Sequence, residues 1–558
     1  MTIRKLRNYV GGEWSEPAGA GWLDVENPAT GGVIARVPLS TAAATDAAIA
    51  AARDAFPAWA ATPVDKRVAP LFRLAGMIRE ERDGIARMLV EENGKSLPDA
   101  RAEIDRTLEN VETACGMPVL QQGDKLVGAA PGIDGEVLRL PVGVFTVIPP
   151  FNFPAMVPFW FIPYALATGN TVVVKPSELV PCTLQHLAGL LDRCGLPAGA
   201  FNLVNGDKAV ARRFTEHPDV AGVSLVGRSE TCRIVAETCA RNNKRFQAMG
   251  GAKNHLVVMP DARMDEVIRN MITSGYGCAG QRCMASSAIV AVGQKTHDDV
   301  VDRFVRASRE VVVADPLDPK VADRAVVVGP VISAAAKEFI LSMIDTGVKE
   351  GARLAMDGRG VKVPGREKGH YVGPTVFTGV TPGMAIHRTE IFGPVQVILR
   401  AGTLDDAIRI INDHPYGNGA SIYTQSGYHA RRFKLEARAG MIGINVGIPA
   451  PVAYLPFGGM KASQYSHIKA QGKAVVRFFT DEKIVTERYW PEARRDPPAA
   501  APRSMASDPR MQACGVRGGA QLGEPREAVA PYNAAGPGAA GGRPRSHVRV
   551  SRTPRGAP

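Results

Sequence analysis

The sequence lacks the features that mark membrane, secreted and disulfide-stabilised proteins. No apolar run in its 558 residues approaches the ~18 residues that a membrane-spanning helix needs. Residues 1–7 contain no apolar h-region of a signal peptide, and an expected hairpin at 9–14 leaves no room for a transit peptide. The eight cysteines include no C-x-x-C pair, a usage that favours reduced thiols. We therefore expect a cytoplasmic protein with no metal site and no membrane partner.

The chain also lacks the interleaving of basic and aromatic residues that single-strand nucleic-acid binders use. Its net charge is +12, yet residues 491–558 alone hold eleven arginines against five acidic residues, which is half of the excess. Pro, Ala, Gly and Arg dominate this segment, so it has too little apolar surface to order itself. We interpret 491–558 as a disordered tail or a reading-frame artefact, and we expect no nucleic-acid partner.

The remaining composition is typical of a large soluble globular protein. Hydrophobic residues make up 45% and charged residues 22% of the chain, and 558 residues are enough for more than one domain. After short strands and turns up to about residue 40, apolar side chains at helical spacing dominate residues 42–115, for example in Val68–Ile78. Gly94 and Pro98 interrupt this region, and the Gly- and Pro-dotted residues 116–140 predict a connecting arm.

From residue 142 onwards, continuous apolar runs alternate with helical patterns. Such runs are expected of strands that are buried on both faces. The order is βαβαβ, which predicts an α/β fold with a parallel sheet that binds ligands at the carboxyl ends of its strands. A second α/β region follows from 246 to about 460, and a last strand is expected at 477–486. The first region has expected strands at Val142–Ile148, Thr171–Lys175, Phe201–Val204 and Gly222–Val226 and expected helices at Ala155–Thr168 and Thr183–Cys194.

Cys283 is the candidate nucleophile. It follows Arg282 directly, behind a run of small residues that lets a ligand approach the backbone. An adjacent cation favours the thiolate, the nucleophilic form of cysteine. A lone cysteine is more often a buried, inert side chain, but other motifs of this chain favour the catalytic interpretation. The nearby Cys278 suggests a redox lock only weakly.

The same stretch contains a misleading motif. Gly275, Gly277 and Gly280 spell G-x-G-x-x-G, which marks a dinucleotide site only after a strand and before a helix. Here the preceding residues 264–272 have helical apolar spacing. We therefore reject this motif as a cofactor loop.

Five motifs occur in a fixed order along the chain, and together they resemble the aldehyde dehydrogenase superfamily over about residues 7–489. The resemblance implies two parallel-sheet α/β domains: a Rossmann-like NAD-binding domain from 1–115 and 141–245, and a catalytic domain from 246–460. It also implies a small β oligomerisation arm from 116–140 and 461–490, and hence a homodimer or homotetramer. The motifs are Pro149–Pro154, Lys175–Glu178, Gly280–Cys283, Glu390–Val395 and Pro456–Ser463.

The resemblance implies a covalent mechanism. Cys283 attacks the aldehyde carbon, and the side-chain amide of Asn152 and the backbone N–H of Cys283 stabilise the oxyanion. Hydride then leaves for a nicotinamide and a thioacyl-enzyme remains. The alternative for Asn152 is a helix cap. His255 lies nearby in sequence, but a lone histidine is more often structural, so we assign it no catalytic role.

The resemblance also implies the cofactor site. Lys175 binds the adenosine ribose, and Glu178 disfavours a 2′-phosphate, so NAD is expected rather than NADP. A salt bridge at a strand end is the alternative for this pair. Gly227 matches the turn near the pyrophosphate, although Arg228 follows it where the family often has a small hydroxyl residue. The expected cofactor contacts are Phe151, Lys175, Glu178, Gly227, Glu390 and Phe392.

Met249 occupies the position of the glutamate that activates water in most of the family. Methionine cannot act as a base, so hydrolysis of a thioacyl-enzyme should be slow. A thiolate needs no such base, which makes coenzyme A the expected acceptor. The stretches Gly251–His255 and Gly280–Ala285 resemble the CoA-acylating branch, the methylmalonate-semialdehyde dehydrogenases, which usually carry asparagine at this position.

Two arginines predict a carboxylate on the substrate. Arg282 adjoins the nucleophile, and Arg106 matches the second arginine of that branch, although an ion pair with Asp105 or Glu109 is an equal alternative. Malonate or methylmalonate semialdehyde fits, giving acetyl-CoA or propionyl-CoA after loss of CO2. The alternatives are a hydrolytic dehydrogenase of another semialdehyde and a silent NAD-binding homologue, which Met249 and Arg228 keep open.

Overall fold

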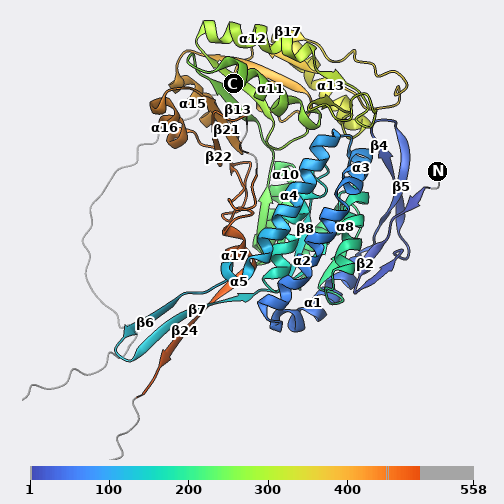
Figure 1. The fold of residues 1–558 in the computed structure, drawn as a ribbon, viewed down its shortest axis with the longest axis vertical. Helices are drawn as coiled ribbons and strands as arrows, with labels where there is room; N and C mark the ends of the chain where they lie inside the picture. The colour runs from blue at the N-terminus through green and yellow to red at the C-terminus, as the bar shows by residue number, and fades with distance from the viewer. Residues whose placement is uncertain (1–2, 448, 450, 491–558) are drawn as a thin grey trace, which may run out of the picture. The chain divides into compact units, whose positions relative to one another are not determined.

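The computed structural model describes residues 3–447, 449 and 451–490, so the predicted tail at 491–558 lies outside the described residues. Within them, two seven-stranded sheets and a three-stranded arm form the framework (Figure 1). None of the helices in this part of the chain combines the length and apolar content that crossing a bilayer requires.

The first sheet confirms the predicted parallel arrangement. Five strands run parallel, and an N-terminal hairpin adds two antiparallel strands at one edge. The interior strands are Val- and Ile-rich and buried along their whole length, as expected of a sheet that is covered on both faces. In order the strands are β12 (Arg245–Met249), β11 (Val220–Val226), β8 (Val144–Ile148), β9 (Thr171–Val174), β10 (Phe201–Leu203), β2 (Asn8–Val10) and β3 (Glu13–Ser15).

The helices around this sheet follow the predicted pattern with one exception. The single helix expected at 155–168 is wrong, since two short helices occupy that stretch. A proline lies inside the first of them and another at the start of the second, and proline cannot continue a helix hydrogen-bond ladder. The helices are α1 (Ala42–Ala61), α2 (Val64–Glu80), α3 (Arg82–Asn93), α4 (Leu97–Cys115), α5 (Met117–Leu120), α6 (Met156–Phe159), α7 (Ile162–Ala167), α8 (Pro181–Arg193), α9 (Lys208–Glu216) and α10 (Ser229–Arg241).

The second sheet has six strands in parallel and one antiparallel edge strand. Its strands in order are β17 (Arg353–Met356), β18 (Thr375–Thr378), β19 (Val395–Ala401), β14 (Ser286–Val292), β13 (Asn254–Val258), β21 (Gly419–Tyr423) and β22 (Met441–Ile444). Its helices are α11 (Met264–Tyr276), α12 (Gln294–Arg309), α13 (Ala334–Lys349), α14 (Ala385–Arg388), α15 (Leu404–Asp413) and α16 (Gly427–Glu436).

The arm is a three-stranded antiparallel sheet that extends away from the helices (Figure 1). Its strands are β6 (Lys125–Ala130), β7 (Ile133–Pro141) and β24 (Thr480–Arg488), the last preceded by α17 (Ala474–Phe479). The remaining short sheets are β1 (Arg4–Lys5), β5 (Gly32–Leu39) and β4 (Gly21–Asn27); β15 (Val312–Val313) and β16 (Val327–Val328); and β20 (Tyr416–Gly417) and β23 (Met460–Lys461).

The predicted segment boundaries differ slightly from the sheets. β12 pairs with β11 in the first sheet, so a boundary at 245/246 cuts through that sheet and the transition comes after Met249. The arm takes only its last strand from the expected 461–490, because α17 packs in the core with β8. The assignment of the parts as cofactor, catalytic and oligomerisation domains stays a prediction.

Candidate active site

The loop that carries Cys283 is shaped by a left-handed turn. α11 ends at Tyr276, and Cys278, Ala279 and Gly280 follow with φ angles of 52°, 52° and 75°. Because G-x-G-x-x-G here follows a helix, its rejection as a dinucleotide loop is confirmed. Gly280 is required for a second reason: a Cβ at this position would lie 2.1 Å from the carbonyl oxygen of Gly393.

Cys283 is partly exposed and lines a pocket of about 430 Å³ together with Arg106 and Arg282. Its carbonyl oxygen accepts hydrogen bonds from the side-chain amides of Asn254, at 2.9 Å, and Asn418, at 3.0 Å. These bonds fix the backbone at the nucleophile while its side chain faces the pocket.

The adjacent Arg282 favours the Cys283 thiolate, as expected, but burial outweighs this effect. Burial, with a smaller contribution from the charge of Glu390, raises the pKa of the Cys283 thiol to about 12. Arg282 lowers this pKa, but less strongly, and its guanidinium is paired with Asp99 at 2.5 Å. In the ligand-free protein the thiol is therefore protonated.

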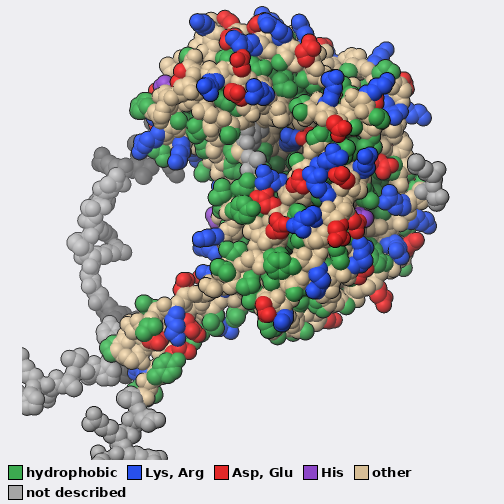
Figure 2. Space-filling model, in the orientation of Figure 1, with side chains coloured by type: hydrophobic (Ala, Val, Ile, Leu, Met, Phe, Trp, Pro, Cys, Tyr) green, Lys and Arg blue, Asp and Glu red, His purple; other side chains and the backbone are tan. Residues whose placement is uncertain are grey.

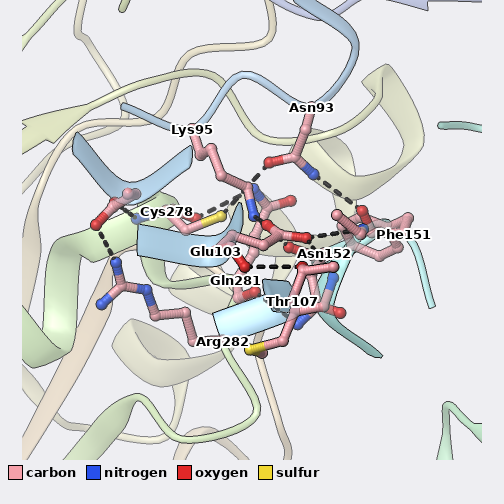
Figure 3. Close-up of polar contacts among 12 residues, drawn as sticks. Asn93, Lys95, Glu103, Thr107, Phe151, Asn152, Cys278, Gln281 and Arg282 are labelled. Atoms are coloured by element: carbon pink, nitrogen blue, oxygen red, sulfur yellow. Dashed lines mark hydrogen bonds and ion pairs between the residues drawn. The ribbon is translucent and has the colours of Figure 1, made fainter. Parts of the chain in front are cut away.

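Asn152 reaches the cysteine loop from the first sheet. It follows β8, is 4% exposed, and donates from Nδ2 to the carbonyl oxygen of Gln281 at 3.0 Å (Figure 3). The alternative of a helix cap does not occur, since Ala155 is the N-cap residue of α6. A primary amide has two N–H groups, so one remains for a ligand beside Cys283.

Lys175 and Glu178 do form the ion pair considered as the structural alternative, at 3.0 Å. The Lys175 ammonium also donates to the carbonyl oxygens of Pro176, at 2.7 Å, and Gly206, at 2.9 Å. Lys175 therefore lies at the carboxyl end of β9, where a parallel sheet binds ligands. These three bonds use all the N–H donors of the ammonium, so binding of a ribose by Lys175 stays a prediction.

Glu390 lies in a separate cluster that reaches Cys283. It accepts a hydrogen bond from the backbone N–H of Ala252 at 2.9 Å, and burial raises its pKa to about 7. The neighbouring Phe392, with φ of 57°, packs edge-on against Phe151 with ring centroids 5.7 Å apart. Residues of three expected motifs thus meet near the nucleophile.

The residues present fit a dinucleotide. α10 is preceded by Gly227 and Arg228, and the N-cap side chain of Arg228 makes no capping hydrogen bond. The first N–H groups of a helix then suit an anion such as a pyrophosphate. The charge of Arg228 lowers the pKa of Glu390, although burial outweighs this effect.

Arg106 and Arg282 face the same pocket as Cys283. Arg106 pairs with Glu109 at 2.5 Å, as in the alternative interpretation, yet its side chain is 41% exposed. The Nε atom of Arg282 is buried and has no hydrogen-bond partner among the described residues. An unpaired buried donor is costly, but this atom is not accessible from the pocket in this structure.

Met249 ends β12 and is 3% exposed. It belongs to the apolar cluster against which Cys283 packs. Its carbonyl oxygen accepts a hydrogen bond from Gly227 at 3.0 Å, which fixes the strand end near the expected pyrophosphate turn. The side chain provides no proton acceptor at this point.

Sequence reasoning missed three buried polar side chains beside the loop of Asn152, namely Asn93, Lys95 and Glu103 (Figure 3). It also missed that His255 packs with His387 and His414, where burial lowers the pKa of each ring. His255 and His387 share a hydrogen bond at 2.8 Å. The structural interpretation of His255 is therefore confirmed.

The fold and this site define an α/β protein with a cysteine placed between two parallel sheets. The sequence model of the aldehyde dehydrogenase family matches residues 14–485 of this chain. The chain belongs to the aldehyde dehydrogenase family.

Individual proteins that are similar to this chain carry more specific names than the family does. Malonate-semialdehyde dehydrogenase 1 of Geobacillus thermodenitrificans (strain NG80-2) is 44% identical over 488 residues, which are 87% of this chain and 99% of that protein. Methylmalonate-semialdehyde dehydrogenase of Oceanimonas doudoroffii is 40% identical with a TM-score of 0.85, covering 88% of this chain and 99% of that one. A protein of Sinorhizobium meliloti 1021 assigned as a methylmalonate-semialdehyde dehydrogenase, and complexed with NAD, is 40% identical with a TM-score of 0.86, covering 89% and 100%.

Proposed function

We propose that this chain oxidises malonate or methylmalonate semialdehyde with NAD and transfers the acyl group from Cys283 to coenzyme A, with loss of CO2. The observation that carries the proposal is the pocket in which the thiol of Cys283 and two arginines face one another. The names of the relatives at 40% and 44% identity support the same substrate class.

The arginines would bind the substrate carboxylate. Arg106 offers a partly exposed guanidinium, and the side chain of Arg282 lines the same pocket. Each is already paired with a carboxylate, Asp99 or Glu109, which holds its side chain in place. In a semialdehyde whose carboxylate is one carbon from the aldehyde, the carboxylate would face the arginines while the aldehyde carbon faces Cys283.

The bond-forming step begins at Cys283. Its thiol proton passes to solvent water in the pocket as Sγ adds to the aldehyde carbon, and the resulting oxyanion meets the free N–H of the Asn152 amide. One such donor contributes about 3 kcal/mol to transition-state stabilisation. Bound NAD would accept the hydride from that carbon. Lys175, Glu178, Glu390 and Phe392 would hold it, and Glu178 would disfavour the extra phosphate of NADP.

The thioacyl group then needs an acceptor. With Met249 at the strand end, no carboxylate activates water there. The thiolate of coenzyme A adds to the thioester carbonyl and Cys283 Sγ leaves. The β-carboxylate departs as CO2 when its C–C bond electrons move toward the thioester carbonyl, and a proton replaces it. Malonate semialdehyde then gives acetyl-CoA, and methylmalonate semialdehyde gives propionyl-CoA.

The exposed apolar side chains of the arm are the evidence for an oligomer. Leu126, Val127 and Ile484 are 64%, 74% and 73% exposed on a sheet with free edges, and apolar side chains are visible on it in Figure 2. Exposed edge strands favour pairing with another chain, so we propose a homodimer or homotetramer. The absence of paired cysteines among the described residues supports a reducing compartment such as the cytoplasm.

The test is product identification. The protein is incubated with each semialdehyde, NAD and coenzyme A, and the products are separated, identified and quantified by mass spectrometry. The proposal predicts acetyl-CoA or propionyl-CoA in equal amounts to NADH and CO2, and none with Cys283→Ala. Free malonate or methylmalonate in equal amounts to NADH would support the hydrolytic alternative instead.

A further inference from the structure

Lys95 and Glu103 form an ion pair whose side chains are both fully buried (0% exposed). Neither residue belongs to a motif of the family resemblance. Lys95 lies just before α4 and Glu103 lies within it, and their contacts converge on the loop that carries Asn152 (Figure 3).

The pair binds the backbone of that loop at Asn152 and again three and four residues after it. The Lys95 ammonium donates to the carbonyl oxygen of Asn152 itself at 2.7 Å. One carboxylate oxygen of Glu103 binds Lys95, and the other accepts from the N–H groups of Ala155, at 2.9 Å, and Met156, at 3.1 Å. The peptide unit of Asn152 and the turn that follows it are thereby fixed relative to each other.

Further contacts remove the remaining freedom of this loop. The Asn93 amide donates to the carbonyl oxygen of Phe151 at 3.0 Å. The Lys95 ammonium lies 4.2 Å from the ring centroid of Phe153. Side chains from residues 93–103 thus contact the backbone or ring of each residue from Phe151 to Met156 except Pro154.

A buried ion pair is a poor means of stabilising a fold, because desolvation offsets its attraction. Its contacts explain its presence better, since charged donors and acceptors make the strongest hydrogen bonds to a backbone. An oxyanion donor must be held to within a fraction of an ångström. We propose that Lys95 and Glu103 are positioning residues that aim the Asn152 amide at the oxyanion beside Cys283.

This inference rests on the proposed role of Asn152, so its test is a double-mutant cycle. Lys95→Met and Asn152→Ala are made singly and together, and kcat is measured at saturating NAD. Asn152→Ala is expected to lower kcat about 100- to 1000-fold. Lys95→Met is expected to lower kcat at least 10-fold in the wild-type background and less than 3-fold in Asn152→Ala, because the donor it positions is then absent.

Glu92→Gln is the matched control. Glu92 is a fully buried carboxylate of the same segment, but it binds the N–H groups of Cys182 and Thr183 at the start of α8. Whatever loss this variant causes should be the same in both backgrounds. If Lys95→Met does not fold, the charge-neutral double change Lys95→Met with Glu103→Gln goes through the same cycle.

The outcomes separate the inference from the function. The cycle is run with any aldehyde that the wild type oxidises, propanal included. The positioning role of Lys95 can therefore be tested even if the protein does not oxidise the semialdehydes. Equal losses from Lys95→Met in both backgrounds, or no loss in either, overturn the inference alone. An unchanged kcat in Asn152→Ala overturns the oxyanion role of Asn152 and the inference with it. The rate of Cys283 alkylation by iodoacetamide in Lys95→Met should stay within 2-fold of the wild-type rate. A variant whose whole active site is disordered would show a larger change.

Discussion

Gly280 lies directly against the carbonyl oxygen of Gly393, so closely that a Cβ at residue 280 would be 2.1 Å from it. This contact joins the loop of Cys283 to the loop of Glu390, which come from distant parts of the sequence. The close approach of Gly280 to Gly393 therefore fixes the separation between the nucleophile Cys283 and the expected cofactor contact Glu390.

Gly280→Ala should therefore damage the site. The backbone φ of 75° disfavours alanine, and the clash is with backbone that cannot rotate away. We expect a loss of about 3 kcal/mol or more in unfolding free energy, with activity lost as well. Gly293→Ala is the control, because Gly293 has φ of 87° with nothing within 4 Å of its Cβ position. Thermal unfolding of both variants measures the difference, and equal destabilisation would contradict the account.

Glu390→Gln should make Cys283 more reactive in the absence of NAD. The Glu390 charge raises the thiol pKa, so removing it lowers that pKa and increases the thiolate fraction at a given pH. Since the pKa of Glu390 is about 7, the difference should be present above pH 7 and disappear below it. Iodoacetamide alkylation of the Cys283 peptide, followed from pH 6 to 9, measures this. Slower alkylation of the variant at pH 8 would contradict the assigned interaction.

Arg106→Gln should weaken binding of a charged substrate only. Loss of a charged hydrogen bond to the substrate carboxylate predicts a KM for malonate semialdehyde raised about 10- to 100-fold. The KM for propanal, which has no carboxylate, should stay within 2-fold. Arg212→Gln removes an exposed guanidinium that is paired within α9 and should change neither value. An equal rise for both aldehydes would show that Arg106 is structural.

Met249→Glu should supply the missing base. A carboxylate at the end of β12 would activate water for hydrolysis of the thioacyl group, an effect that is typically 10²- to 10⁴-fold for a positioned base. We expect steady NADH formation without coenzyme A in this variant. Met249→Gln is similar in size without a base and should remain dependent on coenzyme A. Turnover in the glutamine variant that matches the glutamate variant would refute the assignment of Met249.

Much of the fold was predictable because it rests on long, local patterns. The buried runs at Val144–Ile148 and Thr171–Val174 are continuous in sequence, and α11 has clear helical spacing. The break between α6 and α7 was missed, although Pro158 and Pro163 were visible signals.

The site was predictable only where motifs carried it. Arg282 and Asp99 are 183 residues apart, and nothing in the sequence indicates that they pair. Lys95 and Glu103 are only eight residues apart, but the backbone groups that they bind lie in another loop, and no sequence pattern indicates those contacts. The neighbouring cation that lowers the pKa of Cys283 was visible in the sequence, whereas the burial that raises this pKa was not.

The central claim is tested most directly by counting NADH per Cys283 in the wild type, with malonate semialdehyde and NAD in excess. Without coenzyme A, the account predicts a burst of one NADH per site that then stops, because Met249 leaves the thioacyl group without an activated water. Adding coenzyme A should restart steady turnover. Equal steady turnover with and without coenzyme A would contradict the acylating mechanism.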